Sequence, residues 1–295
     1  MFTRFHKLPD NLKGATMLLL AALCFTVMIT LIKLAGERLH VTQILFMRQV
    51  GMIAMLTPRI RATWPDTFRT QRLGLQFARI GFAIAAMLGS FSAVIHLPLA
   101  DATTIGFAKS FFVTIAAVLL LGEQIGRHRW TALVLGFAGV LIMLRPGTEG
   151  FSVWGLMALG GAACAGVVMV IIRLLSRTEH PLTILAFQAT GVGLVMMLPA
   201  IYFWQWPTAT EWALLASIGF VSYFSQKATI YAYKWAEASL LAPLDYFRLL
   251  YAALLSYLVF GLFPSPNTWI GAALIIGAAL YVFYREQHRK QAEDS

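Results

Sequence analysis

The sequence predicts an all-α polytopic membrane protein that crosses the bilayer ten times. Of its 295 residues, 59% are hydrophobic and only 12% are charged, and the mean hydropathy is +0.73. A soluble domain is closer to half apolar and a quarter charged. Apolar runs of about 20 residues, the length that spans a bilayer as a helix, recur along the whole chain. They lack the alternation of polar and apolar residues that is typical of transmembrane β-strands.

Basic residues, prolines and glycines bound the spans of the first half. The first apolar run follows Arg4, Lys7 and Lys13. It is too long for a signal-peptide core and has no small-residue cleavage site, so we expect an uncleaved helix. Later runs end at helix breakers. We place spans 1 to 5 near 13–35, 42–58, 72–95, 98–121 and 129–145, with stops at Pro58, Pro98, Gly122 and Pro146-Gly147.

The second half shows the same spacing of apolar runs and breakers. Pro181 separates spans 6 and 7, Pro207 separates spans 7 and 8, and Pro264 precedes the last span. We place spans 6 to 10 near 152–175, 181–204, 210–233, 238–262 and 267–284. No connection is long enough to fold as a separate catalytic or nucleic-acid-binding domain.

The excess of basic residues predicts the orientation. Lys and Arg outnumber Asp and Glu by 23 to 13, for a formal charge of +10. In a soluble protein that excess would suggest a nucleic-acid partner; in a membrane protein it reflects topology, because Lys and Arg gather on the cytoplasmic side. Of these residues, 15 lie on the side of the termini, 3 on the opposite side and 5 within spans. We expect both termini in the cytoplasm of a bacterium, the spans in the lipid of its inner membrane, and no nucleic-acid partner.

The two halves of the chain match each other at an offset near 140 residues. Each half holds five spans, and an odd number means that the second copy enters the membrane from the opposite face. We therefore divide the chain into a first repeat, 1–146, and a second, 147–295. Inverted repeats of this kind are characteristic of secondary transporters, which bind substrate near the bilayer midplane. The matches include Cys24 with Cys164, Lys33 with Arg173, Gly51 with Gly191 and Trp130 with Trp269.

Two short motifs point to a known family. Leu120-Leu121-Gly122-Glu123 closes span 4, and Leu135-Gly136-Phe137-Ala138-Gly139 lies in span 5. Over the whole chain, the two five-helix units resemble EamA repeats of the ten-helix drug/metabolite transporter superfamily. The resemblance implies a metabolite carrier, often an amino-acid exporter, with a central cavity lined by spans 1, 3, 4, 6, 8 and 9. It also implies that spans 5 and 10 pack outside or form a homodimer contact.

Charged residues within spans 4 and 9 are the first candidates for substrate binding. A charge at the bilayer centre costs at least about 2.5–3.5 kcal/mol and needs a partner, water or a function. Lys109 lies near the middle of span 4, and Asp245 and Arg248 lie one turn apart in the equivalent span 9. Either Asp245 and Arg248 form a structural pair, or Lys109 or Arg248 binds a substrate carboxylate. Phe107 and Tyr246 adjoin these charges and are candidates for contact with an apolar part of the substrate.

Span 8 is the most polar of the ten. Tyr223, Lys227, Tyr231 and Lys234 recur at helical spacing and form one stripe, which cannot face lipid. We interpret Lys234 as a lysine that snorkels to the interface. Tyr223 and Lys227 lie deeper, and we expect them to line the substrate cavity.

The remaining intramembrane and boundary charges are weaker candidates. Arg79 lies about two turns inside span 3 and is either a gate residue or a snorkelling residue. His96 and Asp101 flank Pro98 at the outer boundary, where solvation explains both and gating or proton coupling is the alternative. Arg48, six residues into span 2, is interpreted as a structural or interfacial anchor.

These features predict a secondary carrier and not an enzyme. The chain has no G-x-x-x-x-G-K-[ST] and no H-E-x-x-H motif, and its six histidines are scattered, so we expect no nucleotide, metal or other cofactor. Cations outnumber Asp245 inside the spans, which favours a carboxylated substrate. We expect export of amino acids, including apolar or aromatic ones. The alternatives are uptake or exchange of a larger anionic metabolite or vitamin and, in another class, an ion channel.

Overall fold

The structure confirms an all-helical membrane protein. The computed structural model describes residues 10–122, 127–144, 152–175, 178–235, 244 and 246–293. Five of the described helices are long and apolar enough to cross a membrane on length and composition alone. The ten spans are α2 (Asp10–Ala35), α3 (Val41–Ala62), α4 (Leu73–His96), α5 with α6 (Leu99–Gly106 and Lys109–Leu121), α7 (Arg127–Leu144), α8 (Val153–Leu175), α9 (Pro181–Tyr202), α10 (Ala209–Trp235), α12 (Phe247–Phe260) and α13 (Pro266–Glu293).

Most helix ends lie within a few residues of the expected positions, because the length of each apolar run and its flanking helix breakers determine where the helix begins and ends. Two helices continue further. α3 runs through Pro58 to Ala62, where Pro58 is exposed near the helix end and removes only one backbone N–H. α13 continues to Glu293, beyond its apolar part, because its polar residues can remain helical outside the bilayer. A short 3₁₀ helix, η1 (Asp66–Phe68), lies between α3 and α4.

Matching helix caps 139 or 140 residues apart show the internal repeat in three dimensions. His40 and His180 precede α3 and α9, and each ring nitrogen accepts a hydrogen bond from the backbone N–H two residues later. α6 and α12 both end at a glycine, Gly122 and Gly261, with a left-handed φ of 65° that favours glycine. Equivalent sequence positions therefore begin α3 and α9, and equivalent positions end α6 and α12.

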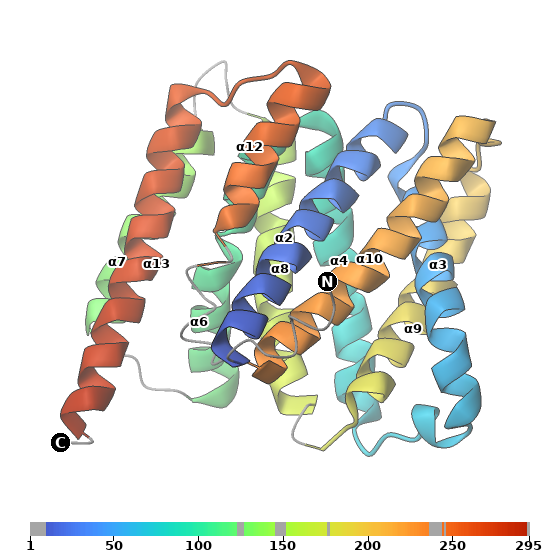
Figure 1. Ribbon diagram of the computed structural model, residues 1–295, viewed down its shortest axis with the longest axis horizontal. Helices are drawn as coiled ribbons and strands as arrows, with labels where there is room; N and C mark the ends of the chain where they lie inside the picture. The colour runs from blue at the N-terminus through green and yellow to red at the C-terminus, as the bar shows by residue number, and fades with distance from the viewer. Residues whose placement is uncertain are drawn as a thin grey trace.

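The two repeats pack into each other, so that each contributes helices to every part of the core. α2 packs along α10, α4 along α8, and α3 along α9. Glycines allow the closest approaches: Gly51 of α3 faces Gly219 of α10, and Gly89 of α4 faces Gly161 of α8. In Figure 1, α2, α4 and α8 lie between α6 and α12 on one side and α3 and α9 on the other, and α10 runs diagonally from these central helices to the side of α3.

Spans 5 and 10 lie at one edge of the molecule, as α7 and α13 (Figure 1). They pack against each other, and Gly139 of α7 lies close to the backbone of Gly271 and the side chain of Leu274 in α13. One face of each helix is thus covered within the chain. A homodimer through their outer faces stays a proposal.

Candidate functional site

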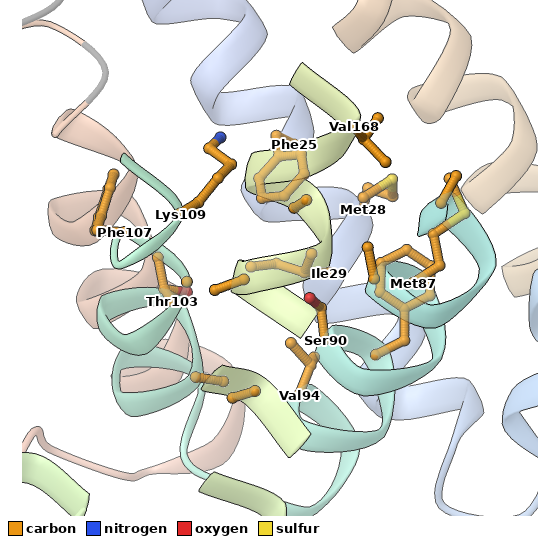
Figure 2. Close-up of a pocket in the computed structure, with 18 of the residues that line it drawn as sticks. Phe25, Met28, Ile29, Met87, Ser90, Val94, Thr103, Phe107, Lys109 and Val168 are labelled. Atoms are coloured by element: carbon orange, nitrogen blue, oxygen red, sulfur yellow. The ribbon is translucent and has the colours of Figure 1, made fainter. Parts of the chain in front are cut away.

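A cavity of about 340 Å³ lies among the central helices (Figure 2). Most of its wall is apolar or made of small side chains, while its polar groups are few, as in many ligand sites. Three of the polar residues are cations, and no carboxylate occurs among the described lining residues. The described residues that line it include Phe25, Met28, Ile29, Arg48, Met87, Ser90, Phe91, Val94, Thr103, Phe107, Lys109, Val168, Met169, Ile172, Gln188 and Arg248.

Lys109 reaches this cavity because span 4 is interrupted. The α-helical pattern stops after Gly106, and the N–H groups of Phe107 and Ala108 donate to carbonyls three residues earlier. Such 3₁₀ connections inside a helix often mark functional hinges. The amides of Ser110 and Phe111 are bonded to the carbonyls of Phe107 and Ala108, so the interruption does not present a bare helix N-terminus to the cavity. Figure 2 shows this side chain extending towards Phe25.

Arg248 occupies the equivalent place in the second repeat. It is the second residue of α12, and its guanidinium carbon lies 4.6 Å from the centre of the Phe25 ring. The rings of Phe107 and Tyr246, one at each helix start, are 5.1 Å apart. Lys109, Arg248 and Phe107 thus line one cavity, whereas Tyr246 contacts Phe107 but lines a separate pocket beside α13. Substrate binding by these residues stays a proposal. Asp245 lies outside the described residues.

Both helix starts lie near the middle of the membrane. α6 has 13 residues and α12 has 14, which gives each a length of roughly 20 Å. Half of the hydrocarbon core is about 15 Å. Because the repeat is inverted, α6 and α12 run towards opposite faces, so Lys109 and Arg248 lie at similar, central depth. This is where discontinuous helices of secondary transporters bind their substrates.

Arg48 is the cavity residue that the sequence analysis missed. The expectation of an interfacial anchor is wrong, because only 6% of Arg48 is exposed and its side chain lines the cavity. Its Nε donates to Ser222 Oγ at 3.0 Å, and its guanidinium carbon lies 5.8 Å from the centre of the Phe91 ring. Its position in the sequence, only six residues into the span, concealed this role. The signal that could have found it is the repeat, which pairs Arg48 with the intramembrane Gln188.

Arg79 is buried, with 3% of its surface exposed, which rules out snorkelling to the headgroups. It joins α4 to α9 by donating to the backbone oxygen of Ile184 and to Gln188 Oε1, each at 2.5 Å. Gln188 lines the cavity, so Arg79 supports the cavity wall from behind. Whether it also acts as a gate stays a proposal.

Tyr223 and Lys227 line a second pocket of about 390 Å³ between α3, α9 and α10, together with Arg59 and His180. Neither they nor any other residue of α10 is among the described residues of the central cavity. The reason is the packing of α10: Ser222 contacts Met28, and Ser225 bonds the Ala21 carbonyl, so the serine face of α10 lies against α2. The tyrosine and lysine stripe is thereby directed to the second pocket.

His96 and Asp101 do not belong to the described cavity wall either. The His96 ring is exposed and stacks on Trp154 with a centroid distance of 3.6 Å. Asp101 accepts a hydrogen bond from the hydroxyl of Thr268, which joins α5 to α13. These contacts support helix packing, and a gating role for either residue stays a proposal.

The sequence was compared with known protein families. The profile of the EamA-like transporter family matches twice, over residues 12–145 and 152–284. The chain belongs to the EamA-like transporter family. It is therefore a membrane transporter of the drug/metabolite transporter superfamily, and not an enzyme, as the sequence predicted.

Curated relatives of this EamA-family chain have different named substrates. It is 27% identical to the riboflavin transporter of Vibrio cholerae over 287 residues, covering 96% of each chain. It is 28% identical to the S-adenosylmethionine uptake transporter of Rickettsia prowazekii over 280 residues, 95% of each chain. It is 29% identical to the pseudopaline exporter of Pseudomonas aeruginosa over 275 residues, covering 92% of this chain and 96% of the exporter.

A solved crystal structure has the same fold as this EamA-family chain. The two share 19% sequence identity and superpose with a TM-score of 0.61, over 92% of this chain and 96% of the other. At this identity the likeness extends to the fold alone. The bacterial relatives together indicate an inner-membrane protein.

Proposed function

We propose that this protein is a secondary carrier that binds a planar, acceptor-rich metabolite in its central cavity and moves it by alternating access. The observation that carries the proposal is the placement of Lys109 and Arg248. They stand at the starts of α6 and α12, two helices of inverted direction, near mid-membrane and on the wall of one cavity. Cationic donors at that depth favour substrate groups with carboxylate, phosphate or carbonyl oxygens.

The lining favours a larger heterocyclic metabolite of the vitamin class over an amino acid. Phe25, Phe91 and Phe107 offer aromatic surface beside the cations, and such surface packs against planar rings. Riboflavin and S-adenosylmethionine, named for two relatives, both contain planar nitrogen heterocycles. The sulfonium and ammonium charges of S-adenosylmethionine would be repelled by three cations, whereas the flavin ring presents carbonyl acceptors. None of the relatives described above is named an amino-acid exporter, so export of amino acids becomes the second candidate.

The substrate-binding candidates from the sequence each receive a proposed role. Lys109 and Arg248 bind the acceptor group, while Phe107 and Tyr246 pack against the ring system. Asp245, three residues before Arg248 in the sequence, is proposed as the carboxylate with which the substrate competes. The second pocket, with Tyr223 and Lys227, is proposed as a vestibule on the cytoplasmic side.

The proposed coupling is facilitated diffusion or exchange. Proton antiport usually requires an unpaired titratable carboxylate on the substrate path. No carboxylate lines the central cavity among the described residues, and Asp245 has the cation Arg248 three residues later in the sequence. An imposed pH gradient across proteoliposomes should therefore not drive uphill accumulation of the substrate. Accumulation that depends on the gradient would contradict this coupling.

Counterflow in proteoliposomes tests the proposed function. Vesicles loaded with unlabelled riboflavin, phenylalanine or S-adenosylmethionine are placed in the labelled compound, and flux is measured in both directions. We expect saturable counterflow of riboflavin. Saturable counterflow of phenylalanine alone would favour the amino-acid candidate, and flux that neither saturates nor shows counterflow would indicate a channel.

Substitutions at Lys109 and Arg248 test whether the transported substrate binds in the central cavity. We expect Lys109→Gln and Arg248→Gln each to weaken binding roughly tenfold to a hundredfold, because a hydrogen bond to a charged group contributes about 1.5–3 kcal/mol. Arg61→Gln removes an exposed cation outside the cavity and is the matched control. Folded Lys109 and Arg248 variants that bind and transport as well as the parent would overturn the assignment.

A further inference from the structure

Arg48 and Gln188 are repeat-equivalent residues that line the same cavity from opposite halves of the protein. They are 140 residues apart, the offset that also relates the caps His40 and His180. α3 carries Arg48 and α9 carries Gln188, and these two helices pack against each other. The family resemblance did not include either helix in the cavity wall, so this pair is a feature of the structure itself.

Arg48 has more N–H donors than acceptors among the described residues around it. A guanidinium has five N–H donors and stays charged. Nε donates to Ser222 Oγ at 3.0 Å, and Nη1 approaches only the sulfur of Met87, a weak acceptor, at 3.8 Å. Nη2 donates to no described residue, and no described carboxylate forms a salt bridge with Arg48. A cation that is 94% buried and bonded to a single oxygen lacks the acceptors that such burial ordinarily requires.

The hydrogen bonds around Gln188 orient it as a donor as well. Its Oε1 accepts from Nη2 of Arg79 at 2.5 Å. With the amide oxygen bound on that side, the amide nitrogen is the group left for other partners. Ser222 fixes Arg48 in a comparable way, since its hydroxyl donates to the Ile218 carbonyl and its oxygen accepts from Arg48.

The helices that carry these donors lie on the other side of the bundle from the helices that carry Lys109 and Arg248. In Figure 1, α3 and α9 lie on one side of α2, α4 and α8, whereas α6 and α12 lie on the other. The rest of the lining is mostly apolar and includes Met28, Ile29 and Val168, with the hydroxyls of Ser90 and Thr103 among them (Figure 2). The cavity therefore has two donor-rich ends and an apolar middle.

We propose that Arg48 and Gln188 form a second anchoring point, which binds a pair of electronegative oxygens at the end of the substrate opposite to that held by Lys109 and Arg248. This inference rests on the proposed function and names its substrate class more closely. The guanidinium fork matches a carboxylate or a phosphate, and Arg48 and Gln188 together can donate to two separate carbonyl oxygens, one each. The substrate thus carries acceptor groups at both ends of an apolar or aromatic body, and a compound with one acceptor end only binds more weakly.

A cysteine placed in the cavity tests, without any substrate, whether the part of the cavity lined by Arg48 and Gln188 attracts anions. Ser90 lines the cavity next to Phe91, and Ser90→Cys is close to isosteric. In a background with Cys24→Ser and Cys164→Ser, the labelling rates of an anionic and a cationic methanethiosulfonate are each normalised to free 2-mercaptoethanol. We expect the normalised rate of the anionic reagent to exceed that of the cationic one by about tenfold or more.

Replacing the charge shows whether Arg48 causes that preference. Arg48→Met should bring the normalised ratio towards unity, Arg48→Lys should retain most of it, and Arg61→Met, on the same helix but outside the cavity, should leave it unchanged. Size-exclusion profiles check folding, and Arg48→Lys provides the comparison if Arg48→Met fails to fold. Equal normalised rates in the parent, or no labelling by either reagent, would overturn the inference.

Binding of riboflavin, followed by flavin fluorescence, gives the second measurement. We expect Arg48→Met to weaken riboflavin binding by about tenfold or more and Arg48→Lys to recover part of it. Unchanged affinity in folded Arg48→Met would refute the second anchor while leaving the carrier function intact. A parent protein that transports neither riboflavin, phenylalanine nor S-adenosylmethionine would refute the proposed function. The thiol-labelling measurement would still test whether Arg48 attracts anions into the cavity.

Discussion

The crossing of α3 and α10 at Gly51 and Gly219 allows a sharp prediction about stability. A Cβ added at Gly51 would lie 2.7 Å from the Cα of Gly219. Carbon atoms in favourable contact are about 3.5–4.0 Å apart. Gly51→Ala must therefore move two backbones apart by roughly 1 Å, because no flexible side-chain end is available to give way.

The expected magnitude follows from two opposing effects. Alanine is more favourable than glycine in a helix by about 1 kcal/mol. Overpacking of a well-packed core costs typically about 1–3 kcal/mol, and contact with backbone places this site at the upper end. Arg48 and Ser222 lie three residues from the crossing, so the separation also stretches their 3.0 Å hydrogen bond. We expect Gly51→Ala to lower the free energy of unfolding by about 1–2 kcal/mol and to weaken substrate binding.

Equilibrium unfolding in mixed micelles measures the change, with two alanine controls. Gly81, on α4, has no neighbouring atom within 4 Å of the added Cβ, so Gly81→Ala should be neutral or slightly stabilising. Gly191, the repeat equivalent of Gly51, would meet the end of the Ile80 side chain, which can change rotamer, so its loss should be smaller. Equal stability of Gly51→Ala and Gly81→Ala would refute the reasoning.

Three further predictions concern pH, the second pocket and topology. Burial lowers the pKa of the His40 imidazole, so the unfolded chain binds this proton more readily, and stability is full above about pH 6.5 and falls as the pH falls below it. His40→Asn, which keeps a capping oxygen, should reduce the loss of melting temperature on acidification. His180→Asn, at the equivalent cap, is the control, and equal losses in parent and His40→Asn would contradict this. Lys227→Met should slow transport but leave equilibrium binding unchanged, since Lys227 lines a separate pocket; a loss of binding as large as that of Lys109→Gln would place it in the central site. A fluorescent protein that matures only in the cytoplasm, fused after Ser295, should fluoresce, whereas a dark fusion of normal abundance would refute the orientation.

The architecture could be predicted because it depends on local features of the sequence. The hydrophobic length of each run determines where a helix can span the bilayer. Pro181 begins α9 and Gly122 ends α6 through local backbone geometry. The matching offset of Gly51 and Gly191 gave the repeat, and with it the equivalence of spans 4 and 9. The clustering of Lys109, Phe107, Tyr246 and Arg248 followed from that equivalence.

What the sequence by itself determined, then, is the number of spans, their repeat and one group of cavity residues. Only the tertiary structure determined which helix faces pack against each other and which line the cavity. Arg48 and Lys227 are both cations on polar stretches of helix, yet the first lines the central cavity and the second does not. Helical periodicity gives the face on which a side chain lies but not the helix that covers that face. In this protein, the helix that packs on a given face is determined by close contacts between residues far apart in the sequence, such as Gly51 with Gly219.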